Sequence, residues 1–277
     1  MIKILKFLRL IKSKFDYLFF HYLIRHLNII LPNNKHPINK NENEKSFKII
    51  SSNKEIKISL HSWATSIINP ELILYHQEVF EKLNLPINYT CSDYKGHGKW
   101  MESILKSSTS EVVIFFDIDC IPLNREIVLE AAKYSNDNVS IFGIAQVSNH
   151  IPPGDFIFCG ASFLAISLEA WKNVGSPPLR EFPGYDVGEY LSYLIIKNNK
   201  KYISLLPEYY HEFSGGYLHC FGEYGIGTYY EGGIFHLWQS RNGKYLNYFF
   251  SACNNILNNT QLDTKNLIRS RRQFKLN

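Results

Sequence analysis

The sequence predicts an α/β fold with a mostly parallel sheet flanked by helices. Short strand patterns alternate with helical patterns from residue 47 onward. One run, residues 112–116, is too continuously apolar for a half-exposed strand, so we expect a central strand covered on both faces. The 277 residues are 45% hydrophobic and 20% charged, which supplies enough apolar side chains for a large core.

Local signals define the remaining elements. Strands are expected at residues 56–60 and 87–91, and a helix lies between them because Asn69 caps it and Pro70 is its first residue. A second helix, over residues 99–107, leads into the buried strand. Beyond it we expect strands at 139–144 and 163–166, and helices from Asn124, after Ser167 up to Gly175, and from Asp186.

Both ends of the chain are basic, although the body between them is acidic. Residues 1–31 place apolar side chains on one helical face and five cations on the other, which predicts an amphipathic helix on an anionic membrane surface. A helix packed on the protein itself or on a partner subunit is the alternative. Residues 32–46 form a polar linker, and residues 251–277 form a basic tail. Residues 15–264, between the two basic clusters, have a net charge of −5, which argues against nucleic acid as a partner.

The five cysteines are odd in number and include no C-x-x-C pair. A disulfide framework and a cysteine zinc site are therefore not expected, and a reducing compartment fits best. Residues 1–31 also lack the clean apolar region and small-residue cleavage site of a signal peptide. We expect a cytoplasmic protein attached peripherally to the cytoplasmic face of a membrane.

Two aspartates, Asp117 and Asp119, follow the buried strand directly. Side chains alternate along an extended backbone, so both carboxylates point the same way at the carboxyl end of the sheet, where α/β folds bind ligands. Paired carboxylates suit a hard divalent cation, Mn²⁺ or Mg²⁺, which can hold a diphosphate. The alternative is a solvated turn in which an aspartate caps the next helix, but Asn124 already supplies that cap.

Residues 97–123, HGKWMESILKSSTSEVVIFFDIDCIPL, resemble the segment of family-2-like GT-A glycosyltransferases that ends in the DxD motif. Residues 160–175 and 183–194 are similar to the acceptor-side strand and the acidic helix start of that family. The resemblance covers about residues 55 to 240 and implies a Rossmann-like GT-A catalytic domain over residues 47–250. It implies transfer of a sugar from a nucleotide-sugar donor to a glycan or lipid-linked acceptor, by single addition because the Q-x-x-R-W signature is absent.

The resemblance also implies roles for single residues. Asp186 matches the catalytic base, with Glu189 close enough to orient or replace it, although Asp-x-x-Glu at a helix start is equally a capping box. The family's acidic pair is Tyr185-Asp186 here, which makes that match less complete. The donor nucleotide would meet residues after the first two strands and at the following helix start, with ordinary turn chemistry and packing as the alternative: His61, Ser62, Trp63, Asp93, Lys99 and, at the DxD motif, Asp117.

Residues 214–233 are rich in glycine and tyrosine. Glycine hinges with aromatic faces suit a lid that closes over a sugar, and an irregular connector is the alternative. His236 follows in a short apolar strand and is the best-placed histidine to complete the metal shell, with a buried core histidine as the alternative.

Two other functions fit parts of the pattern. An apolar strand followed by Asp-x-Asp also opens the fold of phosphatases and phosphotransferases that form an aspartyl phosphate. That fold needs a later lysine and a second acidic pair, and no Gly-Asp-x-x-x-Asp is present. A membrane-tethered, non-catalytic sugar-binding protein is the third reading, and no visible loss of a site residue supports it.

Overall fold

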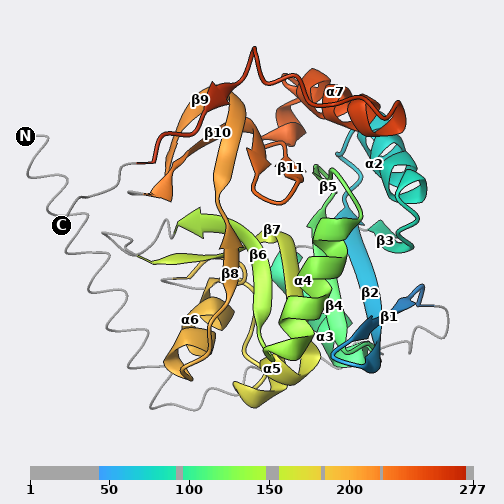
Figure 1. The fold of residues 1–277 in the computed structure, drawn as a ribbon, viewed down its shortest axis with the longest axis vertical. Coiled ribbons are helices and arrows are strands. Elements are labelled where there is room, and N and C mark those ends of the chain that lie inside the picture. Colours follow the sequence, from blue (N-terminus) through green and yellow to red (C-terminus); the bar gives the residue numbers. More distant parts are fainter. Residues whose placement is uncertain (1–43, 92–95, 148–155, 182–184, 219–220, 273–277) are drawn as a thin grey trace, which may run out of the picture.

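The computed structural model describes residues 44–91, 96–147, 156–181, 185–218 and 221–272. The predicted amphipathic helix of residues 1–31, most of the linker, and Asp93 lie outside the described residues. The rest of the chain forms two sheets with helices around them (Figure 1). No helix among the described residues is long and apolar enough to cross a membrane.

The first sheet has seven strands in the order β1-β2-β4-β7-β6-β8, and β3 also pairs with β2. The pairings β2–β3, β2–β4 and β6–β8 are parallel, and β4 and β6 both run antiparallel to β7. Five of the seven strands therefore share one direction, with β1 and β7 reversed, which confirms the α/β class. The strands are β1 (Phe47–Ser51), β2 (Lys54–Ala64), β3 (Ile87–Cys91), β4 (Val112–Asp117), β6 (Ile141–Val147), β7 (Ile157–Ser167) and β8 (Ile203–Leu205).

The strand predicted from its continuous apolar run is β4, and its five apolar residues are all fully buried. Side chains at alternate positions enter two different cores, because successive residues of a strand point to opposite faces. Ile114 and Phe116 pack with helices α2 (Pro70–Lys82), α4 (Glu126–Asp137) and α7 (Leu246–Leu257). Phe115 packs with α3 (His97–Ser107), α5 (Leu168–Asn173) and α6 (Glu189–Lys197). The expectation of a strand covered on both faces is confirmed.

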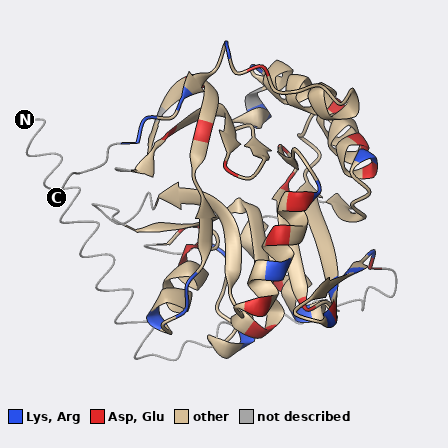
Figure 2. Cartoon of the chain, in the orientation of Figure 1, with Lys and Arg blue, Asp and Glu red and all other residues tan. Residues whose placement is uncertain are grey.

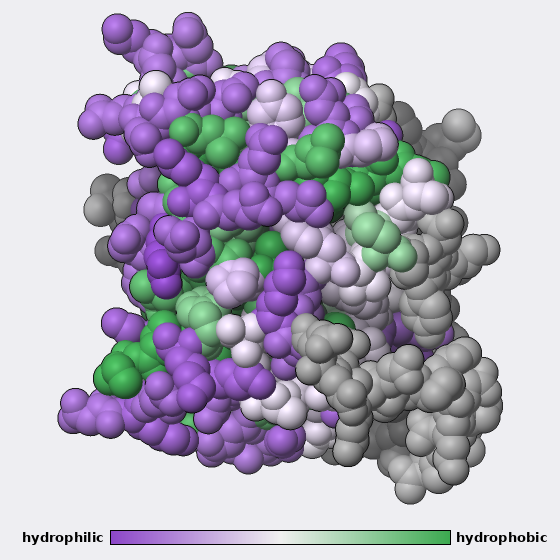
Figure 3. Space-filling model, turned by 90° about the vertical axis from the view of Figure 1, so that its right-hand side faces the viewer, coloured by the Kyte–Doolittle hydropathy of each residue, from purple (hydrophilic) through white to green (hydrophobic). Residues whose placement is uncertain are grey.

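The predicted helix starts have the expected side-chain caps. The Asn69 side chain accepts a hydrogen bond from the backbone N–H of Glu71, and Pro70 begins α2. Asn124 accepts from the N–H of Ile127 at the start of α4, and Ser167 caps α5. Each cap satisfies a backbone donor that the first helical turn leaves unpaired. Helices α2 and α7 lie on the face turned to the viewer in Figure 3, where small hydrophobic patches are interspersed with hydrophilic residues.

The second sheet is antiparallel and was not predicted as such. Residues 214–233 are neither a hinged lid nor an irregular connector, because most of them belong to two long paired strands. Glycine serves close strand packing here: a Cβ at Gly225 would lie 1.9 Å from the carbonyl oxygen of Glu212 on the neighbouring strand. The sheet order is β12-β9-β10-β11-β5, with β5 (Cys120–Pro122), β9 (Pro207–Tyr217), β10 (Glu223–Tyr230), β11 (Ile234–His236) and β12 (Ile268–Arg269).

Several predicted boundaries differ from the structure: β7 begins at Ile157 rather than at residue 163, and α6 begins at Glu189 rather than at Asp186. The first long strand, β2, does not end at Leu60 but continues to Ala64, because its second half pairs with both β3 and β4. Helix α7 crosses the division that we placed between residues 250 and 251, and its Phe249 and Cys253 are fully buried. The C-terminal basic tail therefore begins after this helix rather than within it.

Candidate metal centre and groove

Asp117 is the last residue of β4 and the only charged residue in the three central strands β4, β6 and β7. Figure 2 shows the contrast with α4, whose outer side carries several acidic residues. After Asp117 the chain makes a short turn through Ile118 and Asp119 and enters β5 of the second sheet at Cys120. The two carboxylates thus lie at the junction between the two sheets.

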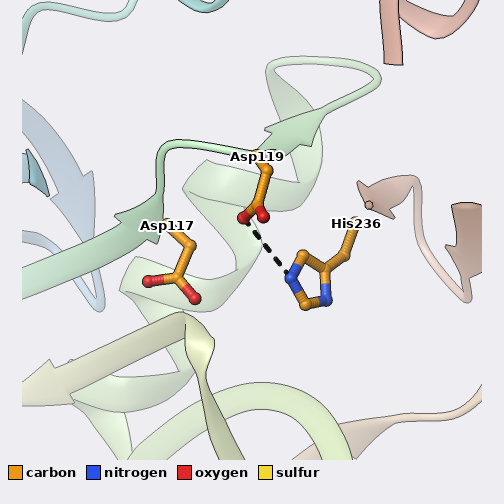
Figure 4. Close-up of side chains that lie close together, drawn as sticks. All are labelled: Asp117, Asp119 and His236. Atoms are coloured by element: carbon orange, nitrogen blue, oxygen red, sulfur yellow. Dashed lines mark ion pairs between the residues drawn. The ribbon is translucent and has the colours of Figure 1, made fainter. Parts of the chain in front are cut away.

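The register of the second sheet brings His236 to this junction. β11 pairs with β5 so that His236 is opposite Cys120, and the N–H of Leu237 donates to the carbonyl oxygen of Asp119 over 2.9 Å. His236 Nε2 lies 3.5 Å from Asp119 Oδ1. One ligand atom from each of Asp117, Asp119 and His236 can be chosen so that all three lie within 4.8 Å of one another (Figure 4).

This cluster fits a hard divalent cation. Two carboxylates and one imidazole form a donor set that Mn²⁺ and Mg²⁺ accept. Burial raises the pKa of Asp119, but hydrogen bonds from His236 and Ser240 and the charge of His236 outweigh it and hold the pKa below its ordinary value. The ring of His236 is 4% exposed, and its Nδ1 has no hydrogen-bond partner among the described residues. No hydrogen bond from Nδ1 to these residues therefore opposes the ring orientation in which Nε2 faces the carboxylates.

Two residues that the sequence analysis did not single out hold Asp117. Ser162 on β7 donates its hydroxyl to Asp117 Oδ2 over 2.7 Å, and His97 Nε2 lies 3.3 Å from Asp117 Oδ1. Each carboxylate oxygen thus has one protein partner and keeps further lone pairs for a cation. Ser162 lies within the predicted acceptor-side strand, but only the antiparallel pairing of β7 with β4 places it beside Asp117.

His76 on α2 supports the turn from below. Its Nε2 lies 3.1 Å from the carbonyl oxygen of Cys120, and its Nδ1 lies 2.7 Å from the hydroxyl of Tyr89. Burial lowers the pKa of His76 to about 4, so the ring is neutral at pH 7. A neutral ring that donates from Nε2 and accepts at Nδ1 satisfies both contacts. A local helical pattern gives no sign of this role.

A groove begins at the carboxylates. A cavity of about 90 Å³ is lined by Asp117, Asp119, Trp63, His97 and Arg241, among others. It shares Trp63, His97 and Arg241 with a larger cavity of about 640 Å³. We call the two together the cationic groove, because the larger cavity carries three cations and one acid: Lys99, Arg180, Arg241 and Glu181.

Stacked rings form one wall of the cationic groove. The rings of Trp63 and His97 are 5.6 Å apart with an interplanar angle of 14°, and His97 and Trp100 are 5.7 Å apart at 19°. Trp63 and Lys99, which were predicted to meet a nucleotide, both line this groove. Arg180 and Arg241 were missed, since isolated arginines carry no motif.

His61 and Ser62, which were also predicted to meet the donor, do not line the groove. His61 is only 2% exposed, lies inside β2 because that strand continues past it, and contacts Glu44 through Nε2 at 3.2 Å. It does not line either cavity. Ser62, its neighbour, is fully buried. Asp93 lies outside the described residues.

Asp186 and Glu189 form only half of the predicted capping box, because α6 begins at Glu189 with Gly188 as its N-cap and the N–H of Glu189 donates to the backbone carbonyl oxygen of Asp186 rather than to its side chain. Glu189 Oε2 accepts from the backbone N–H of Asp186 at 2.8 Å, and Asp186 Oδ1 accepts from the N–H of Val187 at 2.7 Å. Gln146 on β6 donates to Asp186 Oδ2 at 3.0 Å. Glu189 is fully buried, so it can orient Asp186 but cannot reach an acceptor in its place. Asp186 is partly exposed and holds a fixed position.

No protein-family model and no curated protein sequence matches this chain. Solved structures with distant similarity to this chain include the following three. They are the mannosyltransferase PcManGT from Pyrobaculum calidifontis in complex with GDP-Man and Mn²⁺ (11% identity, 53% of this chain, TM-score 0.39), A197 from STIV (14%, 52%, 0.36) and the bifunctional IspDF from Campylobacter jejuni (12%, 52%, 0.34). The matched regions span 54%, 80% and 48% of those chains. At such scores the similarity assigns no activity, so the function must be argued from the site.

Proposed function

We propose that this protein is a metal-dependent glycosyltransferase, which moves a sugar from a nucleotide-sugar donor to a hydroxyl of a glycan or lipid-linked acceptor. One observation carries the proposal: the cluster of Asp117, Asp119 and His236 lies at one end of the cationic groove. Carboxylates that bind a divalent cation and a groove rich in cations are the two features that bind a diphosphate. The stacked ring of Trp63 offers a face for the base.

Mn²⁺ or Mg²⁺, held by Asp117, Asp119 and His236, would supply positive charge against the diphosphate of the donor. The protein's own groups do the rest. Lys99, Arg180 and Arg241 bind phosphate oxygens from the groove side. Asp186 accepts the proton of the acceptor hydroxyl. At the same time the oxygen of that hydroxyl bonds to the anomeric carbon, and the bond from that carbon to the diphosphate oxygen breaks. The donor leaves as the nucleoside diphosphate.

Incubation with a panel of nucleotide sugars and Mn²⁺ tests this function. We expect slow nucleotide release from one donor, faster release when its acceptor is present, and loss of both in Asp119→Asn. Glu130→Gln is the matched control, since Glu130 is an exposed carboxylate on α4 that lines neither cavity of the cationic groove. Hydrolysis of simple phosphate esters in place of nucleotide release would favour the aspartyl-phosphate enzyme. Neither activity, with sugar binding retained, would favour the non-catalytic protein.

We further propose that residues 1–31 attach the enzyme to an anionic membrane surface on its cytoplasmic side, which would bring a lipid-linked acceptor within reach. The support is the five cations on one face of the helical pattern, each worth about 1 kcal/mol near an anionic leaflet. Replacing Lys3, Lys6, Arg9, Lys12 and Lys14 by Gln in the full chain should reduce co-sedimentation with phosphatidylserine vesicles. Equal co-sedimentation of both proteins at low salt would contradict the anchor.

A further inference from the structure

A pair of aromatic rings lies beside the metal cluster. Trp238 follows His236 by two residues, and the centroids of the two rings are 4.5 Å apart. The ring of Tyr224, on β10, is 5.3 Å from the ring of Trp238 at an interplanar angle of 36°. Both side chains are partly exposed, so each has a surface available to a ligand.

Asp186, the predicted base, acts on the aromatic pair through its charge. Burial raises the pKa of Tyr224, and the negative charge of Asp186 raises it further. Gln146 fixes the same carboxylate from β6. Ring contacts therefore connect the metal cluster to Trp238 and Trp238 to Tyr224, whose phenol is influenced by the charge of Asp186.

Different residues contact the two carboxylates of the cluster. Asp117 is contacted by His97, which lines the cationic groove together with Trp63 and the cations of that groove. Asp119 is contacted by His236, whose ring lies beside the ring of Trp238. Neither Trp238 nor Tyr224 lines the cationic groove. A donor whose diphosphate lies at the cluster and whose nucleoside lies in the cationic groove leaves the aromatic pair available to its sugar.

We propose that Trp238 and Tyr224 form the subsite for the transferred sugar ring, between the metal cluster and Asp186. This inference rests on the proposed function. It assigns a binding place to the sugar of the donor, which the cationic groove does not hold. A hexose presents faces of C–H groups, and aromatic faces carry the negative charge density that such groups pack against. A sugar in this place has its anomeric carbon at the diphosphate and its other side toward the carboxylate that receives the acceptor's proton.

Calorimetric titration in the presence of Mn²⁺ tests the subsite. The probes are UDP, GDP and ADP, each compared with its glucose, galactose or mannose conjugates where these exist. Wild type should bind one diphosphate, and one conjugate of that diphosphate should bind more tightly than the others. Trp238→Leu and Tyr224→Leu keep an apolar side chain at each position but remove the aromatic face. They should lose about tenfold of the affinity for that conjugate, and its preference over other sugars, while diphosphate affinity stays within about twofold.

Trp238→Phe and Tyr224→Phe should restore most of the preference, because they keep a ring. Tyr217→Leu is the control, since Tyr217 is an aromatic residue of the same hairpin that is 56% exposed. If the Leu variants of folded protein, verified by thermal unfolding, keep the full preference or lose diphosphate affinity in equal proportion, the subsite is wrong while the donor function stands. If wild type binds no diphosphate with Mn²⁺, both the subsite and the proposed function are wrong.

Discussion

The two sheets of this protein differ in how directly their sequences specify them. In the first sheet, β4 is a continuous apolar run, and three of the helices around it, α2, α4 and α5, begin with Asn or Ser side chains that accept from the first turn. In the second sheet, β9 and β10 mix glycine, tyrosine and charged residues, and their pairing depends on close backbone contact at Gly225. The candidate metal centre takes two carboxylates from the end of the first sheet and its imidazole from the second. A motif predicts the carboxylates directly, whereas His236 was only the best-placed candidate until strand register placed it beside them.

The largest expected effect comes from the first sheet's side of the centre. Asp119→Asn removes one ligand charge, and we expect metal-dependent diphosphate binding to fall by about a hundredfold or more. The fold should persist, because an Asn side chain can keep the contacts of Asp119 with its neighbours. Calorimetric titration with and without Mn²⁺ is the measurement, with Glu130→Gln as control. Diphosphate binding by wild type that does not depend on metal would contradict the assignment.

Asp186→Asn should affect a different quantity. A general base contributes about 10²–10⁴ in rate, so we expect kcat to fall by at least about a hundredfold while donor affinity is unchanged. Asn can still accept from the N–H of Val187, and the Gln146 amide can turn to match it, so the start of α6 should stay intact. Steady-state kinetics of the folded variant are the check. Near-normal turnover would leave Asp186 with only the capping role that its hydrogen bonds also fit.

The second sheet's contribution should be smaller. His236→Gln removes a neutral ligand rather than a charge, so we expect Mn²⁺ affinity to fall by about tenfold. His211→Gln, a half-buried histidine of the same sheet, should leave it unchanged. Manganese titration followed by electron paramagnetic resonance measures both. If His236→Gln binds Mn²⁺ as wild type does, the centre belongs to the first sheet alone and the histidine is a core residue.

The smallest effect expected is on stability, through the histidine that links the sheets. Unfolded chains protonate His76 near pH 6.5, but the folded protein does so only near pH 4. Lowering the pH through this window therefore favours unfolding, by about 1 kcal/mol for each pH unit. Urea unfolding at pH 7 and pH 5 should show this loss in wild type and a smaller one in His76→Asn. Equal pH dependence in the two proteins would show that His76 does not titrate in this way.

The same contrast explains which parts of the site the sequence could predict. Asp117 and Asp119 were predictable because a buried strand rarely ends in two acids without use for them. His61 was misplaced because local propensity gives no reason for β2 to continue to Ala64, whereas pairing on both sides does. Ser162, His97 and Arg241 could not be found, since their relation to the carboxylates depends on tertiary contacts with no regular spacing.

The register between β5 and β11 places His236 in the centre. The turn before β11 therefore helps to decide whether the centre forms. Side chains alternate along a strand, so a slip of one residue would place Phe235 or Leu237 opposite Cys120 and turn the imidazole to the other face of the sheet. The turn that sets this register contains Gly233, whose φ is +100° and where a Cβ would lie 2.5 Å from the Asn124 amide. Evolution could therefore silence this centre without altering any of its ligands, by exchanging one glycine for a larger residue.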